Sequence, residues 1–205
     1  MKSIIAKVII IGGILAGIAA AVILNHPAKT QIAQKNPAPL TPSITITSAP
    51  AITTGSFGEP AKLSIPALSV NNVTVETVGK DSQGRMDIPQ NVTDVAWYSP
   101  GPKPGENGSA VIDGHFDTVT GAPSVFYNLK NLKIGDEIDV VDQNGSNHKF
   151  SVTKVTAYPL ETFPSDIIFA ANTTPHLNLI TCGGSWDKSR HQYSQRVVVF
   201  SDLVK

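Results

Sequence analysis

Cysteine, aromatic residues and charge are all scarce in this chain. Its 205 residues include one cysteine, Cys182, which excludes an internal disulfide and a cysteine-rich zinc site. Aromatic residues make up 6% of the chain and charged residues 16%. The 16 basic side chains equal the 16 acidic ones, so no surplus of Lys and Arg favours nucleic-acid binding. The lone thiol is left to packing, intermolecular pairing or chemistry.

The net charge of zero is the sum of two unlike segments. Residues 1–60 hold four lysines and one glutamate, a net charge of +3, and the remaining residues carry −3. Residues 8–24, VIIIGGILAGIAAAVIL, are uncharged and apolar, and about 20 such residues cross a bilayer. Because Lys2 and Lys7 precede this run, the positive-inside rule predicts a cytoplasmic N-terminus and an exported remainder.

We therefore predict a membrane anchor at residues 1–24 that enters the membrane through residues 4–24. The protein is then a single-pass protein of the cell membrane with its folded domain outside the cell. A cleaved signal peptide is the alternative, because residues 19–21 are all alanine, but the apolar run continues past them. Residues 25–58 are rich in Pro, Thr, Ala and Ser and predict a flexible spacer.

Residues 59–205 are long enough for one domain with its own core, and their pattern is that of an all-β barrel or sandwich. Asn144-Gly145 predicts the tight turn of a hairpin, since this pair accepts positive φ readily. Residues 91–98 and 124–132 each predict a turn or short helix, with Ser124 as a possible N-cap. Short β-branched stretches between turn signals lie at residues 61–68, 73–78, 109–115, 137–142, 149–158, 177–182 and 196–200.

Cys182 stands at the end of the apolar run 177–182 and is followed at once by Gly183-Gly184. Small neighbours leave room for a substrate to approach the sulfur, so a nucleophile is one interpretation. A buried small hydrophobe is the other. Export favours the first, because an unpaired exposed thiol is a liability in an oxidising compartment.

A nucleophilic thiol needs a base, and His115 is the best candidate. It follows the apolar run 109–113 and a glycine, which places the imidazole at the end of a second strand. A structural hydrogen bond is the alternative role for such a histidine. Less suited by their positions are His26 at the membrane exit, His148 in the predicted hairpin, and His176 and His191 in polar loop contexts.

An oxyanion formed during acyl transfer needs a fixed positive charge or hydrogen-bond donors. Arg196 begins the strand-like segment RVVVF, fourteen residues after Cys182, and is the candidate for this role. Arg190, inside the intervening loop, is its competitor, and a solvated arginine at a strand edge is the alternative reading of Arg196.

Three segments together resemble the His, Cys and Arg motifs of sortases, the membrane-anchored cysteine transpeptidases of mainly Gram-positive bacteria. They are SAVIDGHFDT at 109–118, LNLITCGG at 177–184 and QRVVVF at 195–200. The segment from 61, AKLSIPALSVNNVTVETVG, and the run WYSPGPKPG at 97–105 are similar to class F members. Many class F sortases have their Arg two residues earlier, where this chain has Ser194; two residues along a strand keep the same face.

The resemblance implies a closed eight-stranded β-barrel with short helices and an LPxTG-like sorting signal as substrate. It also implies that the Cys182 thiolate attacks the Thr–Gly carbonyl, that Arg196 stabilises the oxyanion or the substrate, and that His115 acts as general acid and base. The thioester is then resolved by water or by an amine acceptor of peptidoglycan. The implied partners are surface proteins that bear sorting signals; no cofactor, metal or nucleic acid is expected.

The segment 159–175 before the Cys182 strand is expected to form a wall of the substrate groove. Ile167, Ile168 and Phe169 line an apolar pocket there or belong to the core, and Thr181 is a candidate neighbour of the substrate. The acids that flank His115, Asp113 and Asp117, either orient its ring or are solvated turn residues, and the second role is the one expected. No acidic cluster predicts a calcium site.

Two other functions fit parts of the pattern. An L,D-transpeptidase or a cysteine endopeptidase of the cell wall would also be exported and use a thiol, but the first has Ser-His-Gly-Cys where this chain has Ile-Thr-Cys-Gly-Gly. An anchored, non-enzymatic β-domain that binds wall polymer or protein would keep Cys182 buried, so thiol labelling separates it from an enzyme.

Overall fold

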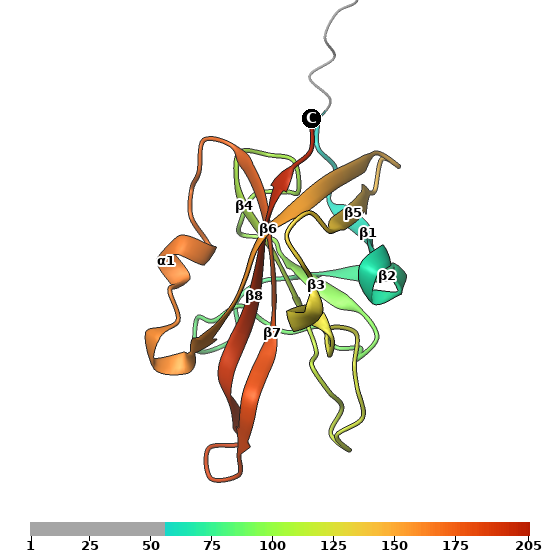
Figure 1. Ribbon diagram of the computed structural model, residues 1–205. Helices are drawn as coiled ribbons and strands as arrows, with labels where there is room; N and C mark the ends of the chain where they lie inside the picture. Colours follow the sequence, from blue (N-terminus) through green and yellow to red (C-terminus); the bar gives the residue numbers. More distant parts are fainter. Residues whose placement is uncertain (1–55) are drawn as a thin grey trace, which may run out of the picture. The chain divides into compact units, whose positions relative to one another are not determined.

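The computed structural model describes residues 56–205 (Figure 1). The anchor predicted at 1–24 and all but the last three residues of the spacer predicted at 25–58 lie outside the described residues. Within residues 56–205, none of the helices is both long and apolar enough to span a bilayer. The first strand of the folded domain, β1, begins at Pro60.

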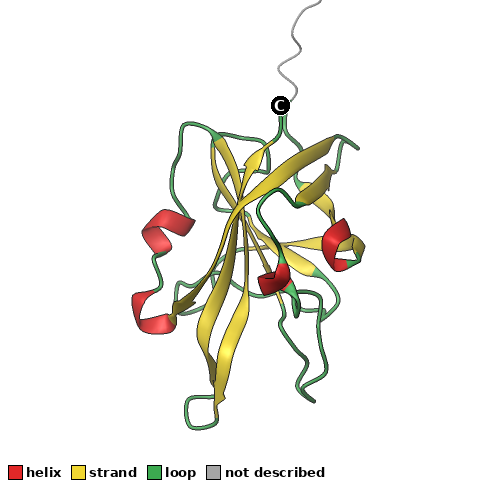
Figure 2. Cartoon of the chain, in the orientation of Figure 1, coloured by secondary structure: helices red, strands yellow, loops and turns green. Residues whose placement is uncertain are grey.

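The strands close into a barrel in the order β1-β2-β3-β4-β7-β8-β6-β5, which confirms the all-β prediction and selects the barrel over the sandwich. Neighbouring strands are antiparallel except in two pairs, β2 with β3 and β4 with β7. Strands make up most of the regular secondary structure, and the helices are single short turns between them (Figure 2). The strands are β1 (Pro60–Ile65), β2 (Val70–Val78), β3 (Val95–Tyr98), β4 (Gly108–Gly114), β5 (Glu137–Asp142), β6 (Asn147–Pro159), β7 (Pro175–Asp187) and β8 (Gln192–Leu203); the helices are η1 (Pro66–Leu68), η2 (Leu129–Asn131), η3 (Leu160–Thr162) and α1 (Ser165–Ile168).

Alternate side chains of the strands fill the barrel. Ala110 and Ile112 of β4 join Leu177 and Leu179 of β7 and Val199 of β8 in the main core, and all five are buried. Successive residues of a strand point to opposite faces, so the residues between them must face outward.

The outward residues of β4, β7 and β8 form a second apolar cluster. Val111, Ile180 and Val198 belong to it together with the fully buried Ile168 of α1, and Phe169 packs against it. Because these strands are covered on both faces, their sequences read as nearly continuous apolar runs instead of a strict alternation. The segment between β6 and β7 thus covers one outer face of the barrel.

The predicted hairpin turn at Asn144-Gly145 is confirmed. It joins β5 and β6, and Gly145 takes a φ of +81°. The carboxylate of Asp142, the last residue of β5, accepts hydrogen bonds from the backbone N–H groups of Asn144 and Ser146, each at 2.9 Å. The turn is therefore held by a buried side chain as well as by backbone pairing.

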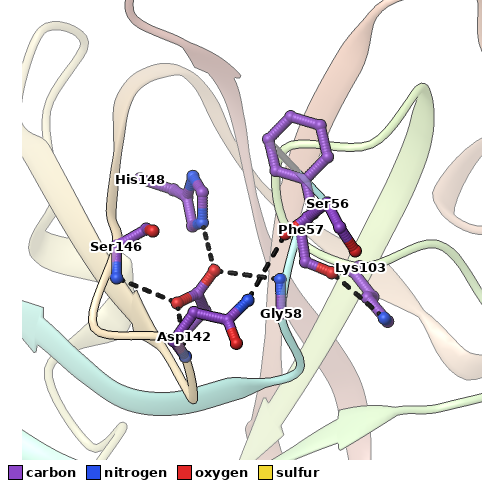
Figure 3. A network of polar contacts seen from close by, with 8 residues as sticks. Ser56, Phe57, Gly58, Lys103, Asp142, Ser146 and His148 are labelled. Atoms are coloured by element: carbon purple, nitrogen blue, oxygen red, sulfur yellow. Dashed lines mark hydrogen bonds and ion pairs between the residues drawn. The ribbon is translucent and has the colours of Figure 1, made fainter. Parts of the chain in front are cut away.

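The chain segment that enters the barrel is attached to this hairpin (Figure 3). Gly58 N–H and His148 Nε2 donate to the same oxygen of Asp142, at 2.9 and 3.0 Å. Lys103 Nζ donates to the carbonyl of Phe57 at 3.0 Å, and the Phe57 ring packs on His148 with centroids 5.3 Å apart. Residues 56–58, predicted as the end of the spacer, thus form part of the folded domain.

The expectation of a turn or short helix was wrong for part of residues 91–98, and it was right for residues 124–132 except for the N-cap at Ser124. Residues 91–94 form a turn, but Val95–Tyr98 form the strand β3, which pairs with β2 and β4. Within residues 124–132, η2 covers Leu129–Asn131, and Ser124 is not its N-cap; its hydroxyl donates to the carbonyl of Val92. Pairing to distant strands decided the conformation of Val95–Tyr98, and no local signal carried it.

β7 and β8 form the longest hairpin, with 13 and 12 residues. Figure 1 shows that this hairpin extends beyond the neighbouring strands of the barrel. The end of β4, the middle of β7 and the start of β8 are adjacent in the sheet, and Cys182 and Arg196 belong to these strands while His115 directly follows β4.

Candidate active site

Cys182 and Arg196 lie directly opposite each other on β7 and β8. Their Cα positions are partners in the antiparallel register, which holds directly opposed Cβ atoms roughly 5 Å apart. Both residues are partly buried. The strand pairing therefore places the guanidinium beside the thiol without relying on loop conformation.

The thiol and the guanidinium share one face of the sheet with the second apolar cluster. Ile180 precedes Cys182 by two residues and Val198 follows Arg196 by two, so each pair points the same way. The face begins as an apolar floor under α1 and ends in polar groups. This arrangement suits an extended peptide with an apolar segment followed by a reacting carbonyl.

The parallel pairing of β4 with β7 places the backbone at His115 alongside the backbone at Cys182. The Thr181 hydroxyl donates a hydrogen bond of 2.7 Å to the carbonyl of Gly114. His115 directly follows Gly114 and Cys182 directly follows Thr181, so this bond joins the two segments next to both residues. The His115 Nε2 lies 2.9 Å from the carbonyl oxygen of Pro89. A carbonyl only accepts, so Nε2 carries a hydrogen and Nδ1 is left for chemistry.

The charges around Cys182 oppose one another. Burial raises the pKa of the thiol, the Arg196 guanidinium lowers it, and the carboxylates of Asp113 and Asp117 raise it further. The thiol pKa is raised overall, so Cys182 rests as a neutral thiol at neutral pH.

Asp113 is not the solvated turn residue that was expected. It belongs to β4 and is partly buried on the face that carries Cys182. Burial raises the pKa of its carboxyl to about 7, against the lowering effect of Arg196. The sequence did place Asp113 on the same strand face as Val111, two residues earlier. It did not show that the segment around α1 packs over this outer face and thereby buries part of Asp113.

Asp117 is engaged by a second residue that sequence reasoning missed, Tyr193. The Tyr193 hydroxyl donates to the Asp117 carboxylate, and this hydrogen bond raises the tyrosine pKa to about 12. The Tyr193 ring contacts Phe116 and Trp186 edge-on, with centroids 5.3 and 5.2 Å apart. Phe116, the residue after His115, thereby packs against Tyr193 near the turn end of the β7–β8 hairpin.

A family profile described as the sortase domain matches residues 63–204. The chain belongs to the sortase family. Sortases are cysteine transpeptidases, and the half-buried thiol beside an arginine is consistent with that chemistry. A search of curated proteins gave no match.

Solved sortase structures share the fold of this chain. Sortase A from Corynebacterium diphtheriae is 20% identical with a TM-score of 0.52, over 74% of this chain and 63% of that one. Sortase C-1 from Actinomyces oris is 24% identical, with a TM-score of 0.53 and 71% of each chain covered. A Clostridium perfringens sortase D5 transpeptidase is 19% identical, with a TM-score of 0.52, over 72% of this chain and 79% of that one. This chain thus spans less than two thirds of the sortase A.

The competing arginine lies away from the sortase thiol. Arg190 occupies the turn between β7 and β8, is exposed, and forms ion pairs with Glu161 at 3.4 Å and Asp187 at 3.6 Å. Ser194, at the alternative position for the arginine, accepts a hydrogen bond from the backbone of Ser185 at 3.0 Å. Of the candidates, only Arg196 stands opposite Cys182.

Three other histidines of the sortase domain have surroundings of their own. His148 pairs with Asp142, and His176 lies 2.7 Å from Asp202. His191 occupies the β7–β8 turn with a φ of +51°. His26 lies outside the described residues. His115 is thus the histidine that β4 brings beside Cys182.

The residues predicted to bind the sorting signal have different exposures. Ile168 is fully buried in the second cluster, Phe169 is partly buried against Tyr98 with ring centroids 5.3 Å apart, and Ile167 is 57% exposed. Thr181 is 1% exposed and bonded to Gly114, on the face opposite Cys182. Their role in substrate binding stays a prediction.

Two surface pockets lie beside these residues. One of about 370 Å³ includes Tyr98 and Phe169, and the other, of about 440 Å³, includes Thr181 and Gly183. Across residues 56–205, no group of three or more His, Cys, Asp or Glu side chains is placed to hold a metal ion.

Proposed function

We propose that this sortase cleaves an LPxTG-like sorting signal and transfers the cleaved protein to an amine acceptor of the cell wall, with Cys182, His115 and Arg196 as catalytic residues. The observation that carries the proposal is the register of β7 and β8, which sets the only thiol of the chain opposite an arginine at the end of an apolar face. The class F motifs in the sequence support placement in that subclass.

The first half-reaction forms a thioester. The Cys182 proton moves to the imidazole of His115, and the thiolate attacks the threonine carbonyl carbon of the signal. The new C–S bond leaves a negative oxygen, to which Arg196 donates hydrogen bonds. The peptide C–N bond then breaks, and His115 returns the proton to the leaving glycine amine.

The second half-reaction reverses these steps with a different amine. An acceptor amine attacks the thioester and gives a proton to His115, the C–S bond breaks, and the thiolate regains its proton. Water in place of the amine gives hydrolysis. The hydrogen bond from His115 Nε2 to Pro89 supports this cycle, because it orients the ring and leaves Nδ1 to carry the proton both ways.

The setting of the reaction is proposed from the sequence. Residues 4–24 anchor the protein as a single pass with the N-terminus in the cytoplasm, and the catalytic domain faces the wall. The substrates are then surface proteins whose sorting signals reach the sheet face that carries Cys182 and Arg196. Ile167, Ile168, Phe169 and Thr181 are the residues proposed to contact the signal or to shape its site.

Mass spectrometry of acylated Cys182 tests the function directly. The full chain in detergent is incubated with a library of LPxTG-like peptides and with scrambled peptides as control. We expect a mass increase equal to the peptide up to its threonine, confined to Cys182 and absent from Cys182→Ala. A full set of cleaved peptides with Cys182→Ala, or no adduct with any library member, would contradict the proposal.

A further inference from the structure

Asp113 is a carboxyl group on the catalytic face that the proposed reaction does not use. Its Cα partner in the parallel register of β4 and β7 is Ile180, and Cys182 is the next residue of β7 that points the same way. Asp113 and Cys182 are therefore diagonal neighbours on one face. Val111, two residues before Asp113, is buried in the apolar cluster that forms the floor of this face.

The groups that face Asp113 and the thiol come from three adjacent segments. Arg196 on β8 interacts electrostatically with both Asp113 and Cys182. Asp117, in the loop after β4, acts on the thiol, and Tyr193 on β8 binds Asp117. The histidine of the site follows directly after β4 and donates to the backbone of Pro89, so its ring does not bind either carboxylate through Nε2.

Within the part of the chain that the structure describes, Arg196 is the only cation that acts on Asp113 and Cys182, and its own hydrogen bond goes to a backbone group. Its Nη1 donates to the Gln195 carbonyl at 3.0 Å, and among residues 56–205 it has no direct ion pair. A carboxylate and a thiolate on the same face compete for one guanidinium. The anion that lies nearer the guanidinium is stabilised and has the lower pKa, and the other anion is then less stabilised.

We propose that Asp113 is a positioning residue that shares the Arg196 guanidinium with Cys182 and thereby controls how readily the nucleophile loses its proton. The inference rests on the proposed role of Cys182 as nucleophile. When Asp113 is neutral, the guanidinium serves the thiolate; when Asp113 is charged, it holds the guanidinium and repels the thiolate. Substrate-independent reactivity of the thiol is the property that this mechanism changes.

Alkylation of the full chain by iodoacetamide measures this property without a sorting signal. Because Cys182 is the only cysteine, the intact mass reports its modification alone. Only the thiolate reacts, so the rate as a function of pH gives the thiol titration. Asp113→Asn keeps the shape of the side chain and removes the charge, and we expect it to lower the thiol pKa by about one unit, roughly 10-fold more thiolate at a fixed pH below that pKa.

Two further variants separate charge from structure. Asp113→Glu should restore most of the wild-type profile, and Asp166→Asn, an exposed acid on α1, should leave it unchanged. In an Arg196→Gln background the effect of Asp113→Asn should shrink at pH 7, because Asp113 without its cation is charged less often. An equal shift in both backgrounds would overturn the sharing of the guanidinium.

The wild-type chain also gives a result that needs no variant. A coupled carboxyl that titrates near pH 7 makes the logarithm of the alkylation rate rise by less than one per pH unit around that value. A single-proton profile in the wild-type chain, or an unshifted profile for Asp113→Asn, would overturn the inference. Failure of the peptide acylation assay with a shifted Asp113→Asn profile would count against the proposed function alone.

Discussion

Asp142→Asn tests whether the attachment of residues 56–58 stabilises the domain. The Asp142 side chain is 1% exposed and accepts four hydrogen bonds, from Gly58, Asn144, Ser146 and His148. An asparagine keeps one accepting oxygen, but its amide nitrogen then faces two donors, Gly58 N–H and His148 Nε2–H. Buried donors without an acceptor cost stability.

The size of the effect follows from the titration of the same group. Burial alone would raise the pKa of Asp142, but the hydrogen bonds from His148 and the three backbone N–H groups bring it down to about 2 from 3.8. That difference corresponds to about 2 kcal/mol of folding free energy. The domain has about 150 residues, so thermal unfolding of Asp142→Asn should occur roughly 4–8 °C below wild type at pH 7.

The dependence on pH has a definite sign. The folded-state pKa lies below the unfolded value, so the stabilisation is complete above pH 3.8 and is lost as the pH falls through about 2. Melting of the full chain in detergent, followed by circular dichroism at pH 7, 4 and 2, should show a gap between variant and wild type that narrows only at pH 2.

Glu137→Gln is the matched control. It removes an exposed carboxylate from the same hairpin, 2.7 Å from Lys149, and should change stability by less than about 0.5 kcal/mol. If the two variants melt together, or if the gap for Asp142→Asn is the same at pH 7 and pH 2, the reasoning about the buried carboxylate is refuted.

Two further predictions concern the site. Arg196→Ala should lower the turnover of sorting peptides about 100- to 1,000-fold, the cost of losing an oxyanion donor. Arg190→Ala, in the exposed turn, should change turnover less than about 2-fold. Peptide cleavage assays with both variants measure these effects, and the reverse ranking would assign the role to Arg190. Thr181→Val replaces a buried hydroxyl by a methyl group and leaves the Gly114 carbonyl without its 2.7 Å partner. It should therefore lower the free energy of unfolding by about 1–3 kcal/mol and lower kcat. Unchanged melting and unchanged kcat would contradict a hydrogen bond that joins β4 to β7 at this point.

The strands could be predicted where the sequence itself is distinctive. The β-branched runs 109–115, 177–182 and 196–200 became β4, β7 and β8, and Asn144-Gly145 formed the expected turn. The number and spacing of such segments predicted an all-β barrel or sandwich, and the sortase resemblance implied the closed barrel that the structure shows. β3 was missed because its four residues are held by pairing with β2 and β4, and short apolar segments carry no reliable local signal for such pairing.

Cys182, His115 and Arg196 could be chosen as candidate site residues because each lies at the end of a predicted strand. The residues that surround them in the folded domain could not be predicted. The opposition of Cys182 and Arg196 depends on the register of β7 and β8, which includes an irregularity between Gly183 and Trp186. No residue pattern fixes that register in advance. The partial burial of Asp113 depends on the segment around α1, which begins 52 residues later at Ser165 and covers the apolar face beside Asp113.

The parallel pairing of β4 with β7 also bears on how the protein folds. Thr181 and Gly114 are 67 positions apart in sequence, and β5 and β6 occupy the interval between them. Closing so long a loop carries an entropic cost before the pairing contributes any stabilisation. Folding of this domain is therefore expected on the slow, millisecond-to-second scale of proteins dominated by distant contacts, and the thiol gains its neighbours from β4 only when that closure is made.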